Sequence, residues 1–137
     1  MNANVPAFLR FRLPVYVWAA LISVSSSFPL QVPPSLEIPF ADKLAHAGIY
    51  FILGFLLARA IRNSLPAIIG GKQAFYASFV GFLYGALDEW HQSFVPLRHA
   101  DFGDAVVDAI GAVVGAVVFI MLASNAKRGI YGCHKAI

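Results

Sequence analysis

The sequence predicts an all-α protein: a polytopic membrane protein, built as an antiparallel four-transmembrane-helix bundle with both termini cytoplasmic. Three observations support this fold class. The 137 residues are 59% hydrophobic and only 12% charged, whereas an average soluble chain carries about 25% charged residues. Four apolar segments each approach the ~20 residues that a helix needs to cross ~30 Å of hydrocarbon. Acidic and basic residues collect on opposite sides of these segments.

The first apolar segment, residues 14–30, follows Arg10 and Arg12 and ends near a run of serines. This pattern resembles a secretory signal peptide. We nevertheless expect the segment to be retained as the first helix, because the chain starts at Met1. The proline-rich residues 29–39 follow it. They predict an extended, stiff outer loop, since proline fixes its own φ and restrains the residue before it.

The second and third segments are predicted to be antiparallel neighbours. Asp42 is placed to cap a helix over residues 44–61, because its side chain can accept a bond from the first turn. Residues 62–72 form a loop short enough to return the chain directly into the next helix. That third helix covers residues 74–94 and is ended by Pro96, which cannot continue a helix.

The fourth segment, residues 105–124, begins beside Asp104, whose negative charge suits the positive end of a helix. Residues 1–13 are predicted to be a short cytoplasmic lead. Residues 125–137 are predicted to be a basic cytoplasmic tail. Residues 14–124 therefore form the membrane domain, and the chain has no room for a separate soluble domain.

The charged residues predict how this domain is oriented. We assume that the four segments cross the membrane in alternating directions. The acidic side then holds Glu37, Asp42, Asp88, Glu89, Asp101, Asp104, Asp108, Lys43 and Arg98. The other side holds Arg10, Arg12, Arg59, Arg62, Lys72, Lys127, Arg128 and Lys135. Excess lysine and arginine marks the cytoplasmic side of a membrane protein. The acidic side is therefore predicted to be extracytoplasmic. The basic residues form no single patch, which argues against nucleic acid as a partner.

Three helix ends on the acidic side carry polar residues at helical spacing. The predicted pocket residues are Asp42, Lys43, His46, Tyr50, Asp88, Glu89, Gln92, Arg98, Asp104 and Asp108. On the third and fourth helices the same face carries the pairs Gly81/Gly85 and Gly111/Gly115, and such small residues let membrane helices pack closely. Ionisable groups in a membrane usually face the bundle interior or a water-filled cavity. We therefore expect these faces of the third and fourth helices to point toward each other and to form an outward-facing acidic pocket above close-packed glycines.

Two interpretations of these polar groups stay open. They could serve only to hold the bundle together, with His46 as a satisfied core histidine. However, five acidic residues face only Lys43 and Arg98 as fixed cations, and burying an unpaired charge is expensive. The surplus predicts a protonated carboxyl, a bound cation, or a ligand with cationic or hydrogen-bond-donor groups. If the site is catalytic, the candidate groups are Glu89, Asp104 and His46.

Familiar catalytic and metal motifs are missing from the sequence. The run Asp101-Phe102-Gly103 copies a kinase tripeptide, but no glycine-rich loop accompanies it. The chain has neither a His-Glu-x-x-His pair nor a Gly-x-Ser-x-Gly elbow. No cofactor and no metal site are predicted. A divalent cation stays open, and the carboxylates would suit Mg²⁺, Ca²⁺ or Mn²⁺ better than zinc. Cys133 is the only cysteine, which excludes an intrachain disulfide.

Three polar blocks in this order resemble the VanZ-like family of small bacterial integral membrane proteins. The blocks, within residues 40–118, are Asp42-Lys43-x-x-His46-x-x-x-Tyr50, Asp88-Glu89-x-x-Gln92-x-Phe94-x-Pro96-x-Arg98 and Asp104-x-x-x-Asp108-x-x-Gly111-x-x-x-Gly115. Two positions depart from the family pattern. Leu97 stands where the family often has glycine before the arginine, and Asp108 stands where it often has asparagine.

The resemblance implies a multi-pass protein of the bacterial cytoplasmic membrane with its polar site on the extracytoplasmic side. It also implies a role in the cell envelope linked to low-level resistance to the glycopeptide teicoplanin. We expect the pocket to bind a lipid-linked or glycopeptide-like ligand without catalysis. The alternative is an intramembrane hydrolase or transferase acting on a lipid phosphate or lipid-linked sugar. Its base would be Glu89 or Asp104 and its acid His46 or Tyr50. Arg98 and Lys43 would clamp the phosphate.

A third hypothesis is a proton- or ion-coupled carrier. Four helices are few for alternating access, so a carrier would need to oligomerise. The lipid bilayer is the one partner that the composition itself predicts, and the sequence does not define an oligomeric state.

Overall fold

The computed structural model describes residues 6–28, 41–98 and 101–133, with side chains described up to residue 126. These residues form helices and no strand. The elements are a π-helical segment η1 (Phe8–Arg12), α1 (Leu13–Ser26), α2 (Ala41–Ser64), α3 (Gly71–Gln92) and α4 (Phe102–Cys133). The all-α prediction is thus confirmed. The expected proline-rich loop, Glu37 and Lys135 lie outside the described residues.

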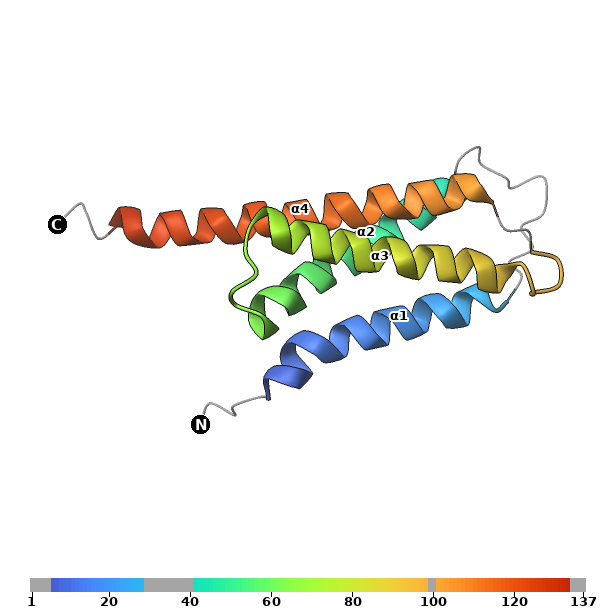
Figure 1. Ribbon diagram of the computed structural model, residues 1–137, viewed down its shortest axis with the longest axis horizontal. Coiled ribbons are helices and arrows are strands. Elements are labelled where there is room, and N and C mark those ends of the chain that lie inside the picture. The colour runs from blue at the N-terminus through green and yellow to red at the C-terminus, as the bar shows by residue number, and fades with distance from the viewer. Residues whose placement is uncertain (1–5, 29–40, 99–100, 134–137) are drawn as a thin grey trace.

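The helices form an antiparallel bundle. α1 and α3 run in one direction and α2 and α4 in the other, so that η1 begins and α4 ends at the same end of the bundle (Figure 1). We call the opposite end the polar end. It consists of the last turns of α1 and α3 and the first turns of α2 and α4. The other end is called the basic end, because it carries Arg10, Arg12, Arg59 and Arg62.

Three helical stretches are long and apolar enough to cross a membrane: Phe8–Ser26, Ala41–Ser64 and Phe102–Ala126. The chain therefore has the helices of a multi-pass membrane protein. α3 has 22 residues, which corresponds to about 33 Å at 1.5 Å per residue. Its last turns carry Asp88, Glu89 and other polar residues, so α3 is less apolar than the other three. That α3 also crosses the membrane stays a prediction.

Helical structure extends beyond each predicted segment at one end or both. α2 covers Ala41–Ser64 rather than residues 44–61, and α3 starts at Gly71 rather than at residue 74. Helical structure starts at Phe8 in η1, within the expected cytoplasmic lead. α4 continues to Cys133, beyond the expected end of the fourth segment at residue 124. The residues after Ser124 include Ala126, Lys127 and Arg128 and no proline. Because such residues are good helix formers, nothing in the sequence stops α4 there.

The closest packing in the bundle joins α2 to α4. A Cβ atom added at Gly115 would collide with the backbone of Phe51, and one added at Gly111 would lie 2.5 Å from the Ala47 carbonyl oxygen. A Cβ atom added at Gly54 of α2 would likewise collide with the backbone of Ala112 in α4. The absence of side chains at these positions lets the two backbones touch. The glycine pair of α4 thus packs on α2, whereas the sequence suggested that it would face α3.

The glycine pair of α3 packs on α4. A Cβ at Gly81 would lie 2.7 Å from the Cβ of Ala112, and a Cβ at Gly85 would lie 3.2 Å from the Cβ of Asp108. Tyr50 borders Gly85 from the α2 side, where one of its ring carbons would lie 3.3 Å from the added Cβ. These contacts bring the polar faces of α2, α3 and α4 together at the polar end.

α1 lies at the edge of the bundle and is attached mainly through polar side chains. The indole N–H of Trp18 donates to the Ile49 carbonyl oxygen at 2.9 Å. The hydroxyl of Tyr84 donates to the Ala19 carbonyl oxygen at 2.5 Å and lies 2.7 Å from the hydroxyl of Ser23. A hydrogen bond in an apolar surrounding competes with no water. These bonds therefore anchor a helix that buries few of its apolar side chains.

The turn after α3 contains the one non-glycine residue with positive φ among those described, Leu97 at 67°. A β-carbon makes this left-handed conformation unfavourable by about 1–2 kcal/mol. The side chain of Leu97 is 72% exposed, so it gains little from burial in return. Glycine, which often stands at this position in the family that the sequence resembles, would adopt the same φ without strain.

The variant Leu97→Gly is therefore expected to be more stable than the wild type by about 0.5–1 kcal/mol, since strain relief exceeds the extra entropy of an unfolded glycine. The measurement is the midpoint of thermal unfolding in detergent micelles. Val95→Gly is a matched control in the same turn, and it should not stabilise because Val95 has no positive φ. A lower midpoint for Leu97→Gly would show that the turn is not strained.

Candidate functional site

The outer part of the polar end is an ion-pair cluster, which we call the rim: Lys43, Asp101 and Asp104. The ammonium nitrogen of Lys43 lies 2.7 Å from a carboxylate oxygen of Asp104 and 3.1 Å from one of Asp101. Asp101 is the most accessible member, with 56% of its side chain exposed. The backbone N–H of Gly103 and the Lys43 ammonium both stabilise its carboxylate, which lowers the pKa of Asp101. In the rim, two carboxylates therefore share one cation.

Asp101 also begins α4. Its Oδ1 accepts the backbone N–H of Gly103 at 2.7 Å, and its carbonyl oxygen accepts the N–H of Asp104 at 3.0 Å. These bonds make it the N-cap of the helix. The kinase-like tripeptide in the sequence is thus a helix start. The backbone N–H of Asp101 donates to Oε2 of Glu89 at 3.0 Å, which links the rim to the groups beneath it.

Beneath the rim lies a second group, which we call the buried triad: His46 of α2, Glu89 of α3 and Asp108 of α4. Nδ1 of His46 lies 3.1 Å from Oδ1 of Asp108. Asp108 is fully buried, and Glu89 is only 7% exposed. Oδ2 of Asp108, Oε1 of Glu89 and the hydroxyl of Tyr50 are buried and have no hydrogen-bond partner among the residues that the structure describes. Two carboxylates are thus buried with part of their bonding capacity unused.

A third group joins α1 to the end of α3, and we call it the Asp88 network: Ser26, Asp88, Gln92 and Arg98. Oδ2 of Asp88 accepts the Ser26 hydroxyl at 2.7 Å and the Gln92 amide at 2.8 Å. The guanidinium of Arg98 donates to Oε1 of Gln92 at 2.9 Å. It also donates to the carbonyl oxygens of Ser25 and Phe28, at 3.2 and 3.1 Å. Gln92 therefore bridges the Asp88 carboxylate and the Arg98 guanidinium.

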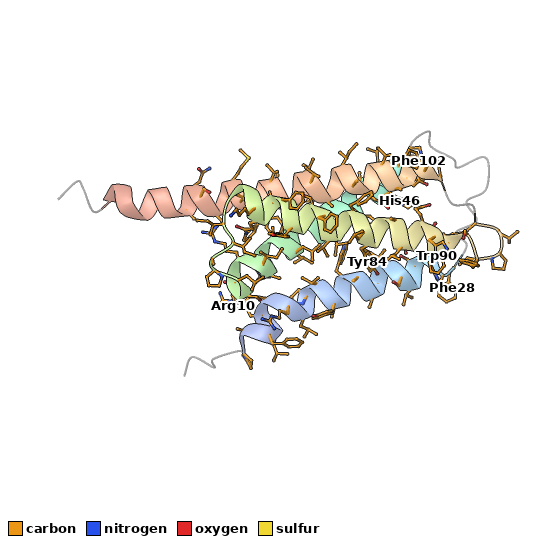
Figure 2. The ribbon with its side chains drawn as sticks, in the orientation of Figure 1. Arg10, Phe28, His46, Tyr84, Trp90 and Phe102 are labelled. Carbon is orange, nitrogen blue, oxygen red and sulfur yellow. The ribbon has the colours of Figure 1, made fainter. Side chains whose placement is uncertain are left out.

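The structure brings most of the predicted pocket residues to the polar end, where Figure 2 shows His46 and Trp90, with Arg10 at the opposite end. Lys43, His46, Glu89, Asp104 and Asp108 lie in the rim and the buried triad. Asp88, Gln92 and Arg98 lie in the Asp88 network, and Tyr50 lies beside Gly85. Asp42 is exposed in the first turn of α2.

Sequence reasoning missed two contributors. Asp101 was counted only as a charge, although its position two residues before Gly103 is the signal for a side-chain capping bond. Ser26 was read as part of an apolar segment. It is only 4% exposed, and a lone buried hydroxyl needs a partner.

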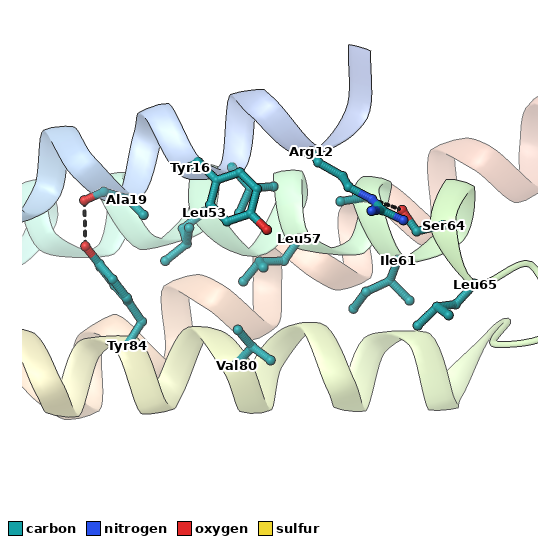
Figure 3. Close-up of a pocket in the computed structure, with 12 residues that line it drawn as sticks. Arg12, Tyr16, Ala19, Leu53, Leu57, Ile61, Ser64, Leu65, Val80 and Tyr84 are labelled. Carbon is teal, nitrogen blue, oxygen red and sulfur yellow. Dashed lines mark hydrogen bonds between the residues drawn. The ribbon is translucent and has the colours of Figure 1, made fainter. Parts of the chain in front are cut away.

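A cavity in the described residues lies away from the rim, the buried triad and the Asp88 network. It has a volume of about 460 Å³ and lies between α1, α2 and α3 (Figure 3). Apolar side chains such as Leu53, Leu57 and Val80 line most of it. Arg12 and Ser64, whose side chains are hydrogen-bonded at 2.9 Å, border it toward the basic end. None of its lining residues belongs to the rim, the buried triad or the Asp88 network.

Comparison with known proteins agrees with the resemblance drawn from the polar blocks. The model of the VanZ/LLP1 family matches residues 5–123, which is most of the chain and includes every residue of the rim, the buried triad and the Asp88 network. Neither the curated proteins nor the solved structures give a match. With its membrane-length apolar helices, this chain belongs to the VanZ/LLP1 family of VanZ-like membrane proteins.

Proposed function

We propose that this protein resides in the bacterial cytoplasmic membrane with its polar end facing away from the cytoplasm, where it binds a glycopeptide-like ligand of the cell envelope. Lys/Arg-rich ends of membrane helices stay cytoplasmic. Arg10, Arg12, Arg59 and Arg62 gather at the basic end, opposite the rim, and this asymmetry supports the orientation.

One observation carries the ligand class. Four carboxylates lie together at the polar end, from the rim and the buried triad, and the fixed cation among them is Lys43. A purely structural network would approach neutrality, because unmatched charge costs free energy. The excess acidity suits a ligand that presents ammonium, amide N–H or hydroxyl donors, as a glycopeptide does. Teicoplanin resistance is therefore the activity that we propose.

Binding is better supported than hydrolysis of a lipid phosphate. A phosphate clamp needs free cationic side chains. Lys43 is held between Asp101 and Asp104. Arg98 donates to Gln92 and to two carbonyl oxygens of α1 and its end. Both cations are thus engaged within the chain.

The test is the teicoplanin susceptibility of a sensitive bacterium that expresses this protein. We expect the wild type to raise the inhibitory concentration. Asp104→Asn and Glu89→Gln should each remove most of the rise, because each takes one negative charge from the carboxylates at the polar end. Arg98→Ala should weaken it by loosening the attachment of α1.

Lys72→Gln is the control, since Lys72 is an exposed residue at the far end of α3 and should leave the rise intact. Protein levels in the membrane fraction must match. An unchanged inhibitory concentration on expressing the wild type, or full resistance in all three polar-end variants, would contradict the proposal.

A further inference from the structure

We propose that His46, Glu89 and Asp108 bind one divalent transition-metal ion, Mn²⁺ or Zn²⁺. The three side chains come from three different helices and meet beneath the rim. Each offers one ligand atom, and these atoms all lie within 4.8 Å of one another. Neighbouring ligands of a tetrahedral ion with bonds of ~2.1 Å are ~3.4 Å apart. The side chains therefore need to close by at most ~1.4 Å to hold an ion.

Unused bonding capacity points to a ligand at this place. Oδ2 of Asp108 and Oε1 of Glu89 are buried and accept no hydrogen bond from the described residues. A buried acceptor without a partner is expensive, and a charged one more so. The two atoms belong to two of the three residues of the triad. A cation between the triad residues would supply the missing partner of both carboxylates at once.

The charge of the triad matches a dication. A ligating histidine is neutral, so the two carboxylates give the triad a charge of −2. The cation of the rim, Lys43, is already shared by Asp101 and Asp104. Bringing a dication into the triad makes it neutral, which is the arrangement that costs least inside a membrane domain.

The donor set selects the class of metal. One imidazole nitrogen with two carboxylates suits manganese and zinc, whereas magnesium and calcium prefer oxygen ligands alone. The sequence had favoured Mg²⁺, Ca²⁺ or Mn²⁺ because it showed the carboxylates without showing which of them meets His46. The hydrogen-bond distance between His46 and Asp108 changes that preference.

The ion site does not depend on glycopeptide binding, and it is tested on the protein alone. The full chain, purified in detergent without a histidine tag, is stripped with EDTA and titrated calorimetrically with Mn²⁺ and with Zn²⁺. Bound metal is then measured by mass spectrometry after gel filtration. We expect about one ion per chain, as three ligands on a single centre imply, and a rise in the thermal unfolding midpoint with added metal.

Matched variants distinguish metal binding at the triad from non-specific metal binding to other acidic residues. Asp108→Asn and His46→Ala should each weaken binding by at least ~10-fold and abolish the metal-dependent rise in midpoint. Asp42→Asn and His91→Ala make the same chemical changes at exposed positions of the polar end and should bind as the wild type does. Glu89→Gln serves if a first variant fails to fold. A wild type that retains no ion, or triad variants that bind as tightly as the controls, would overturn the proposal. A bound ion without teicoplanin resistance would leave this site standing and reject only the proposed function.

Discussion

Gly115→Ala is expected to destabilise the bundle by about 2 kcal/mol or more, although it adds a single methyl group. That methyl would collide with the backbone of Phe51, and a backbone cannot rotate away as a side chain can. α2 and α4 would have to separate along their shared interface, at the cost typical of overpacking a close-packed core. The measurement is the free energy of unfolding in mixed micelles, followed by circular dichroism.

Gly48→Ala is the matched control. It makes the same substitution in the middle of a helix, but a Cβ at Gly48 meets nothing within 4 Å. Alanine has the higher helix propensity, by up to about 1 kcal/mol. Gly48→Ala should therefore leave stability unchanged or raise it. Equal effects of the two substitutions would mean that the close α2–α4 approach does not exist.

Asp88→Ala is expected to cost about 3 kcal/mol, because it leaves two buried donors without an acceptor and each such loss costs about 1–3 kcal/mol. The hydroxyl of Ser26 and the amide of Gln92 would both lose their acceptor. Because Gln92 also positions Arg98 against the end of α1, that helix should loosen as well. Proteolysis between α1 and α2 in micelles should therefore become faster, alongside the drop in unfolding free energy.

Asp42→Ala provides the comparison, since it removes an exposed carboxylate from the first turn of α2. Its loss should cost less than about 1 kcal/mol, the usual value of an acidic side chain at a helix N-terminus. If Asp88→Ala proved as mild as Asp42→Ala, the buried network would contribute nothing to stability.

The helices themselves followed from the sequence because apolar runs of membrane length leave a chain little choice. The ends of the helices were predicted less accurately. The fourth segment was expected to start at residue 105, yet α4 begins at Phe102, where Asp101 caps it and Asp104 lies in the first turn. A capping bond depends on local backbone geometry, which periodicity does not encode.

Contacts between helices were harder to predict from the sequence than the helices themselves. The spacing of Gly111 and Gly115 indicates a close approach, but it names no partner helix, and the structure supplies α2. In the same way, the spacing of polar residues grouped His46 with the acidic residues without giving its 3.1 Å contact to Asp108. Spacing along one helix defines a face, while pairing between helices is decided by the packing of the whole bundle.

The central claim is that acidic groups from separate helices meet at one end of the bundle, on the outer side of the membrane. Single cysteines at the two ends test it most directly, in a Cys133→Ser background. Asp101→Cys marks the polar end and Lys72→Cys the basic end. In intact cells, a membrane-impermeant maleimide should label position 101, and position 72 only after permeabilisation. Labelling of position 72 from outside, with position 101 protected until the cells are opened, would contradict the account.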